Sequence, residues 1–180
     1  AQTAAAQATA AAQAVAAATA TQAGGGQGGR ASGSARGQEP AAPPVVVDPR
    51  EELHRLLVSG RLEEAMNKAL SASDLPLVMW LCSRLDPAAT ATSLPQHILL
   101  CLVQQFGASD LLQDTTTKLN WLQNCALAID PTDTTIRAHL PLVLRQLRGA
   151  LSAATPTIAQ GGGPDLAVVT LTTHVVNSLA

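Results

Sequence analysis

The chain has 180 residues and a formal net charge of −2, with 11 basic residues interspersed among 13 acidic ones. Aromatic residues make up 2% of it, and no basic patch or stripe stands out. Nucleic-acid binding usually depends on clustered Lys and Arg side chains for phosphates and on aromatic rings for unpaired bases. We therefore expect no direct contact with RNA or DNA.

The composition changes abruptly near residue 45. Residues 1–44 are almost entirely Ala, Gln, Thr and Gly, and the part from 24 to 44, GGGQGGRASGSARGQEPAAPP, is typical of a linker. The Ala-rich part before it favours a helix but has only Val15 to bury. We predict a disordered or weakly helical linker over 1–44 and one helical domain over 45–180, long enough to bury about two thirds of its unfolded surface.

Three cysteines, Cys82, Cys101 and Cys125, lie in apolar helical patterns. An odd number without paired spacing indicates free thiols in a cytosolic protein. No run of 18 apolar residues is present, so we expect no membrane span. Because the chain begins with Ala rather than Met, we also expect it to be the excised end of a longer protein.

Apolar residues recur at helical spacing from Asp48 onward. Asp48 caps the first predicted helix, and Gly60 ends it in a left-handed conformation. A second helix over about 62–70 follows at once. Either Ser73 or Asp74 caps the third, which is apolar on more than one face and therefore central.

Four further helices are predicted after the segment DPAATAT, which reads as a connection. Ser93 caps the fourth, which Gly107 closes, and the fifth runs from about Asp114 to Ile129. The sixth spans Thr134 to Leu151. It is capped by Asp133 and kinked by Pro141, which removes a backbone hydrogen bond.

The last stretch, LAVVTLTTHVVNSLA, is rich in strand-forming residues. It nevertheless carries apolar residues on one helical face and has no partner strand, so we predict a seventh helix. Short connections make neighbouring helices antiparallel. The chain is thus predicted to be an all-α, armadillo- or HEAT-like stack of about seven helices. Its predicted core contains Leu53, Leu57, Leu70, Val78, Trp80, Leu81, Cys82, Leu99, Leu102, Leu119, Leu122, Leu144 and Leu147.

No pattern of catalytic, cofactor-binding or metal-binding residues emerges. Glu63 and Glu64 are adjacent and diverge by about 100° on a helix, so they do not form a carboxylate pair. No histidine lies three or four residues from another histidine, and the one His–Cys pair at such a spacing, His97 and Cys101, supplies too few ligands for a metal site. We predict that the chain is not an enzyme and needs no cofactor or metal. The alternative of a hydrolase with Cys82 as nucleophile would need a base such as His97 or His139.

Three blocks occur in order: EEAMNKALSASDLPLVMWLCSRLDP, SLPQHILLCLVQQFG and KLNWLQ…AIDPTD. Together they resemble the C-terminal domain of the enhancer-of-mRNA-decapping scaffold family, and most of all its plant members, called VARICOSE. The likeness covers about residues 48–180. Met66 stands where the family usually has an aromatic residue, and Pro95 alters one turn.

The resemblance implies a non-catalytic scaffold with an armadillo-like helical end. Family members bring the decapping enzyme and its activators together in cytoplasmic processing bodies, and this domain contributes to localisation and to contact with decay partners. The expected partners are therefore the decapping enzyme and its activators, or a decay exonuclease. Self-association through the full-length protein stays open.

We expect a partner-binding surface to be built from exposed charged residues. The apolar residues that match the family, such as Trp80 and Leu81, are expected to form the core. A helical oligomerisation domain of a cytoplasmic protein, which self-associates through an exposed apolar ridge, is the alternative. The candidate partner-binding residues are Arg84, Lys118, Arg137, Arg145 and Arg148.

Overall fold

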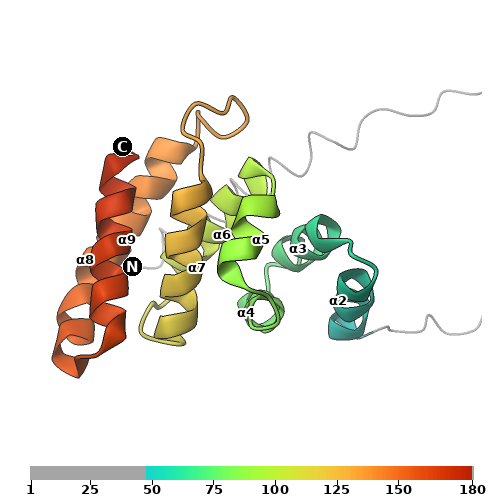
Figure 1. The fold of residues 1–180 in the computed structure, drawn as a ribbon, viewed down its shortest axis with the longest axis horizontal. Helices are drawn as coiled ribbons and strands as arrows, with labels where there is room; N and C mark the ends of the chain where they lie inside the picture. The colour runs from blue at the N-terminus through green and yellow to red at the C-terminus, as the bar shows by residue number, and fades with distance from the viewer. Residues whose placement is uncertain (1–47, 180) are drawn as a thin grey trace, which may run out of the picture. The chain divides into compact units, whose positions relative to one another are not determined.

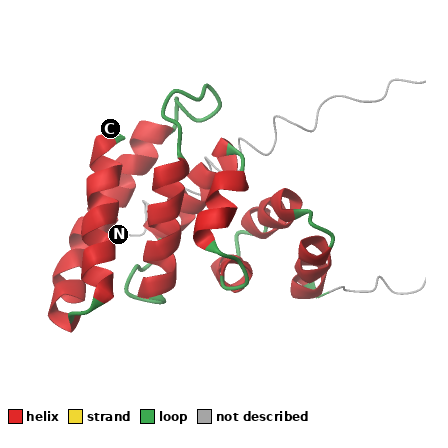
Figure 2. Ribbon diagram, in the orientation of Figure 1, coloured by secondary structure: helices red, strands yellow, loops and turns green. Residues whose placement is uncertain are grey.

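The computed structural model describes residues 48–179, which belong to a unit that starts at Val45. The prediction for 1–44 lies outside the described residues. Within 48–179 the structure has eight α-helices and no strand, one helix more than predicted (Figure 2). They are α2 (Pro49–Val58), α3 (Leu62–Ser71), α4 (Leu75–Cys82), α5 (Pro87–Ser93), α6 (Gln96–Ala108), α7 (Thr115–Ala128), α8 (Leu140–Gly161) and α9 (Pro164–Ser178).

From α5 onward the helices pack in two layers (Figure 1). α5, α7 and α9 lie side by side and run in the same direction, and α6 and α8 return behind them. α3 packs on α6, and α2, α3 and α4 pack on one another at the end of the array away from α8 and α9. This alternation of direction confirms the all-α, armadillo-like prediction.

Carboxylates and a glycine set the boundaries of the first helices as predicted. The Asp48 side chain accepts a hydrogen bond from the backbone N–H of Arg50 at 2.9 Å. Of the two candidates for the α4 cap, Asp74 holds the position and accepts from the N–H of Leu77 at 3.4 Å. Gly60, with φ +74°, follows α2 in the left-handed conformation that only glycine adopts without strain.

The prediction that DPAATAT is a connection is wrong, because it forms α5. Asp86 caps this helix by accepting from the N–H of Ala89 at 2.7 Å. Ser93 is the last residue of α5 and does not cap α6, because its hydroxyl donates to the Ala89 carbonyl at 3.0 Å. A helix of Ala and Thr buries only small side chains, Thr90 and Ala91 among them, so no large apolar residue marked its face.

The predicted helix from Thr134 is also wrong, because α8 begins at Leu140. Asp133 caps a turn instead, accepting from the N–H and the hydroxyl of Thr135. Short polar side chains of this kind compete with helical hydrogen bonds. Pro141 then lies in the first turn of α8, where its missing N–H costs nothing, so it makes no kink.

The C-terminal half differs in length from the prediction but not in type. α8 continues beyond the predicted end at Leu151 to Gly161, with Pro156 inside it. α6 likewise runs one residue past Gly107, which packs so closely on α8 that an added Cβ would lie 3.3 Å from Leu147 Cδ1. The last stretch is helical, as predicted, and α9 packs against α7 and α8.

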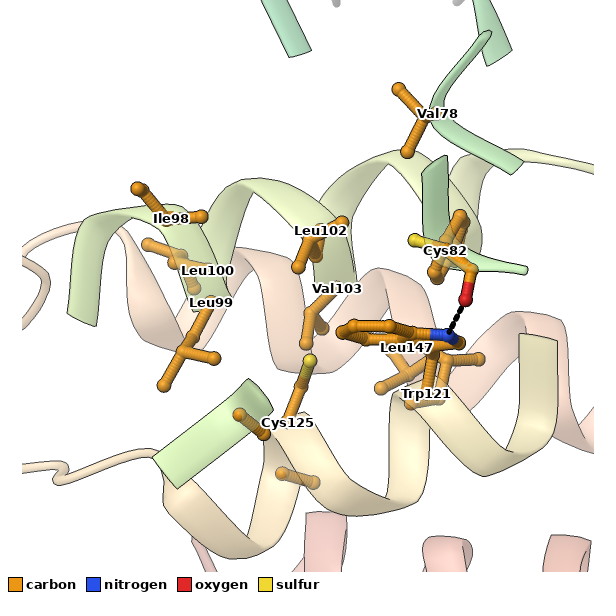
Figure 3. Close-up of a cluster of buried hydrophobic side chains, with 14 of the residues drawn as sticks. Val78, Cys82, Ile98, Leu99, Leu100, Leu102, Val103, Trp121, Cys125 and Leu147 are labelled. Carbon is orange, nitrogen blue, oxygen red and sulfur yellow. Dashed lines mark hydrogen bonds between the residues drawn. The ribbon is translucent and has the colours of Figure 1, made fainter. Parts of the chain in front are cut away.

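The centre of the core is the indole of Trp121, whose residue is 0% exposed. Figure 3 shows it among Val103 of α6, Leu147 of α8 and Cys82 of α4. Its Nε1 donates to the Cys82 carbonyl at 3.3 Å. This single side chain of α7 therefore contacts three other helices.

Eleven of the predicted core residues are buried. The prediction is wrong for Trp80 and Leu57, which are partly buried and pack against the edge of the core. Trp80 precedes the buried Cys82 by two positions, or about 200° around the helix, so its ring lies toward the outside of α4. The buried ones are Leu53, Leu70, Val78, Leu81, Cys82, Leu99, Leu102, Leu119, Leu122, Leu144 and Leu147.

The two tryptophans should therefore differ in their contribution to stability. We expect Trp121→Ala to lower the free energy of unfolding by about 3–5 kcal/mol, because it leaves a cavity and removes the hydrogen bond to the Cys82 carbonyl. Trp80→Ala should cost about 1–2 kcal/mol, because its ring is only partly removed from water. Urea unfolding followed by far-UV circular dichroism measures both, and an equal or larger loss for Trp80→Ala would contradict this order.

Candidate interaction surface

The five predicted partner-binding residues do not form one surface. Arg84 follows α4, which packs on α2 and α3, whereas Arg145 and Arg148 lie on α8, which packs on α6 and α9. Arg137 lies in the turns before α8. Arg84, Arg137 and Arg145 are exposed and Arg148 is partly buried. The structure thus separates Arg84, which follows α4, from the two arginines of α8, since these two helices lie apart (Figure 1).

Lys118 is not a surface residue, and this prediction is wrong. It is 2% exposed, and its Nζ donates to the backbone carbonyl of Asp110 at 2.7 Å. A lysine can bury its aliphatic stem while its ammonium group pairs with a backbone acceptor. Lys118 thus ties the start of α7 to the segment that follows α6, and it is unavailable to a partner.

Arg84 lies over a partly buried aromatic ring. Its guanidinium carbon is 5.0 Å from the centroid of the Trp80 ring, and that of Arg50, from α2, is 6.0 Å from the same ring. Both distances are in the range of cation–π attraction. Sequence reasoning missed Arg50, because nothing in the chain indicates that α2 and α4 meet there. The four-residue spacing of Trp80 and Arg84 on a helix was the one available signal.

The outer face of α9 carries two exposed leucines. Leu171 is 47% exposed and Leu166 is 36% exposed. Together with Ala167, Thr170 and His174 they line a shallow hollow along the helix. No charged residue lines this hollow, so it differs in character from the arginines of α8 and from Arg84.

The chemical groups of residues 48–179 give little basis for catalysis. No three His, Cys, Asp or Glu side chains in this part of the chain come together as metal ligands. Burial raises the pKa of the Cys82 thiol far above its ordinary value, and the nearby Cys125 raises it further. Burial also raises the pKa of Cys125, to about 12. A nucleophilic cysteine requires the opposite shift.

None of the described helices is long and apolar enough to span a membrane.

The three thiols should react with an alkylating reagent in a defined order. Cys101 is exposed on α6, whereas Cys82 and Cys125 are buried, so we expect Cys101 to be labelled first in the native protein. Partial burial raises the pKa of Cys101, so its thiolate is scarcer at neutral pH than in a free cysteine. Its labelling rate should rise about tenfold per pH unit from pH 7 to pH 8.

Mass spectrometry of the labelled peptides, with the urea-unfolded chain as control, measures this order. Labelling of Cys82 before Cys101 in the native protein would contradict it and would revive the interpretation of Cys82 as a nucleophile.

Comparison with known proteins identifies the family. Residues 53–161 match the family model described as Enhancer of mRNA-decapping protein 4, C-terminal. The chain belongs to this family. The matched region contains the three blocks noted in the sequence and ends at the last residue of α8, so α9 lies beyond it.

Individual relatives agree with the family match. The chain is 39% identical over 101 residues to Enhancer of mRNA-decapping protein 4 from Homo sapiens, covering 54% of this chain and 7% of that protein. It is 33% identical over 121 residues to the Drosophila melanogaster homolog, covering 65% of this chain and 9% of that protein. The chain therefore spans less than a tenth of the length of these relatives.

A solved structure has the same fold. The crystal structure of the conserved C-terminal region of Ge-1 superposes with a TM-score of 0.66 at 26% sequence identity. The match covers 73% of this chain and 98% of that one.

Proposed function

We propose that this chain is a non-catalytic protein-interaction module of an mRNA decapping complex. The observation that carries the proposal is the family match over residues 53–161, joined to the likeness to nearly the whole conserved C-terminal region of Ge-1. The curated relatives are named as enhancers of mRNA decapping. This chain would serve the same process by binding protein partners.

The geometry supports binding of proteins. Layers of helices present exposed ridges and grooves that suit a peptide or another helix. The exposed arginines lie near both ends of the array, which allows more than one partner to bind at once. Two or three arginines in one place are too few to hold a nucleic-acid backbone firmly.

We infer the partners and the location from the same family. The partners are the decapping enzyme and its activators or a decay exonuclease, and the complex resides in cytoplasmic processing bodies. RNA is held by these partners and not by this domain. Residues 1–44 serve as a linker that joins the helical domain, from residue 45 onward, to the rest of a scaffold able to self-associate.

A binding experiment with purified proteins tests this function. The immobilised chain should retain the decapping enzyme, one of its activators or a decay exonuclease. A folded variant with Arg84, Arg137, Arg145 and Arg148 changed to Glu should retain less than about a tenth as much, because like charges repel where opposite charges attracted. The circular dichroism spectrum of this variant serves as the folding control. If the unaltered chain retains none of these proteins, the proposed function is wrong.

Self-association is the second candidate function, and the apolar hollow on α9 favours it. If this face pairs with a second copy, light scattering should show a mass that rises with concentration. The double change of Leu166 and Leu171 to Gln should abolish the rise, whereas Leu127→Gln, at an exposed leucine on α7, should not. A constant monomeric mass would exclude this candidate.

A further inference from the structure

Two guanidinium groups converge on the ring of Trp80 from different parts of the chain. Arg84 lies in the turn after α4, four residues after Trp80, and Arg50 lies in the first turn of α2. Their guanidinium carbons are 5.0 and 6.0 Å from the ring centroid. The ring is partly buried and anchored against the core, whereas both arginine side chains are exposed. We call these three residues the Arg–Trp cluster.

No carboxylate of residues 48–179 forms an ion pair with the Arg–Trp cluster. Asp48, Asp74 and Asp86 are close to its residues in sequence, and each accepts from a backbone N–H at the start of a helix. The ion pairs found within residues 48–179 join Arg61 to Glu64 and Lys68 to Glu52. Arg50 and Arg84 therefore have no carboxylate partner within the described part of the chain.

The chemistry of arginine makes this arrangement suited to an anion. A guanidinium can stack its face on an aromatic ring while its N–H groups remain free to bind a carboxylate in a bidentate manner. Stacking on a fixed ring limits the freedom of both side chains, so less entropy is lost when a ligand binds. A ligand with two negative groups would also relieve the repulsion between the two cations.

We propose that the Arg–Trp cluster binds an acidic peptide segment of a protein partner, with one carboxylate on each arginine. In an extended peptide, side chains two positions apart point to the same side and are separated by about 7 Å, a span that suits two guanidiniums placed over one ring. The identity of the partner as a decapping factor rests on the proposed function. The binding of an acidic peptide by the Arg–Trp cluster does not.

Direct titration of the full chain with a synthetic peptide tests the site. The probe is a short Ser/Gly peptide with two glutamates two positions apart, and the same peptide with Gln in place of Glu is its control. Trp80 reports binding through its fluorescence, since the other tryptophan, Trp121, is fully buried. The change should vanish in Trp80→Phe and weaken with added salt.

Charge-neutral variants assign the binding to the two arginines. Arg50→Gln and Arg84→Gln should each raise the Kd of the Glu peptide about tenfold, the loss expected for one charge-assisted contact. Arg55→Gln is the matched control, because Arg55 is exposed on the same helix as Arg50 but about 140° around it. Its Kd should stay within about twofold of that of the unaltered chain.

Three results would overturn the proposal. They are equal affinity for the Gln peptide, equal affinity of all three Arg→Gln variants, and tighter binding of a single-stranded oligonucleotide than of the Glu peptide. Unchanged circular dichroism spectra guard against misfolded variants.

The outcome is separable from that of the proposed function. If a decapping factor is retained equally by the unaltered chain and by the Arg50→Gln/Arg84→Gln double variant, the Arg–Trp cluster is not its site. If the peptide binds as expected but no decapping factor is retained, the peptide site stands and the proposed function fails.

Discussion

The fold depends on how Trp121 is buried. Its indole fills the space between α4, α6 and α8, and its Nε1 is paired with the carbonyl of Cys82 (Figure 3). That carbonyl belongs to the last turn of α4, where a helix leaves its C=O groups without partners of its own. The Leu85 N–H also donates to this carbonyl, at 3.3 Å, so the bond from Trp121 satisfies the buried indole donor and holds the end of a short helix against α7.

The orientation of α4 in turn determines what the surface presents. With Cys82 directed inward, Trp80 lies on the other side of the helix and is only partly buried. Arg50 and Arg84 then cover its ring, while the aspartates close to them cap helices. None of these aspartates forms an ion pair with either arginine. The surface that a partner would recognise is therefore a consequence of how α4 packs in the core.

Much of the fold could be predicted because local physics determines it. Asp74, Gly60 and the leucine periodicity act within a few residues of themselves, so helix type and most boundaries followed from the chain. The short α5 was not predicted because Ala and Thr give no periodic apolar pattern. Residues 134–139 were wrongly predicted as helix because Asp133 can cap either a turn or a helix. Sequence alone could not separate the two outcomes, since Pro141 fits both the interior kink and the first turn.

The candidate surface was less predictable, because it depends on contacts between distant segments. Lysine is usually a surface residue, so the sequence predicted that Lys118 is exposed. Its burial is explained only by the position of the Asp110 carbonyl, to which its Nζ donates. The pairing of Arg50 with Trp80 joins helices that are separated by α3. Burial of Trp80 was predicted because its helix is apolar on more than one face, but the tryptophan that is fully buried is Trp121.

Hydrogen exchange of the full chain, alone and with a purified decapping factor, tests the central claim most directly. The account predicts that the slowest amides lie in α4, α6 and α7 around Trp121 and do not change when the factor binds. New protection should appear at the start of α2 and around Arg84. Fast exchange throughout α7 in the free chain, or binding that alters the amides around Trp121 and leaves those near Arg84 unchanged, would contradict it.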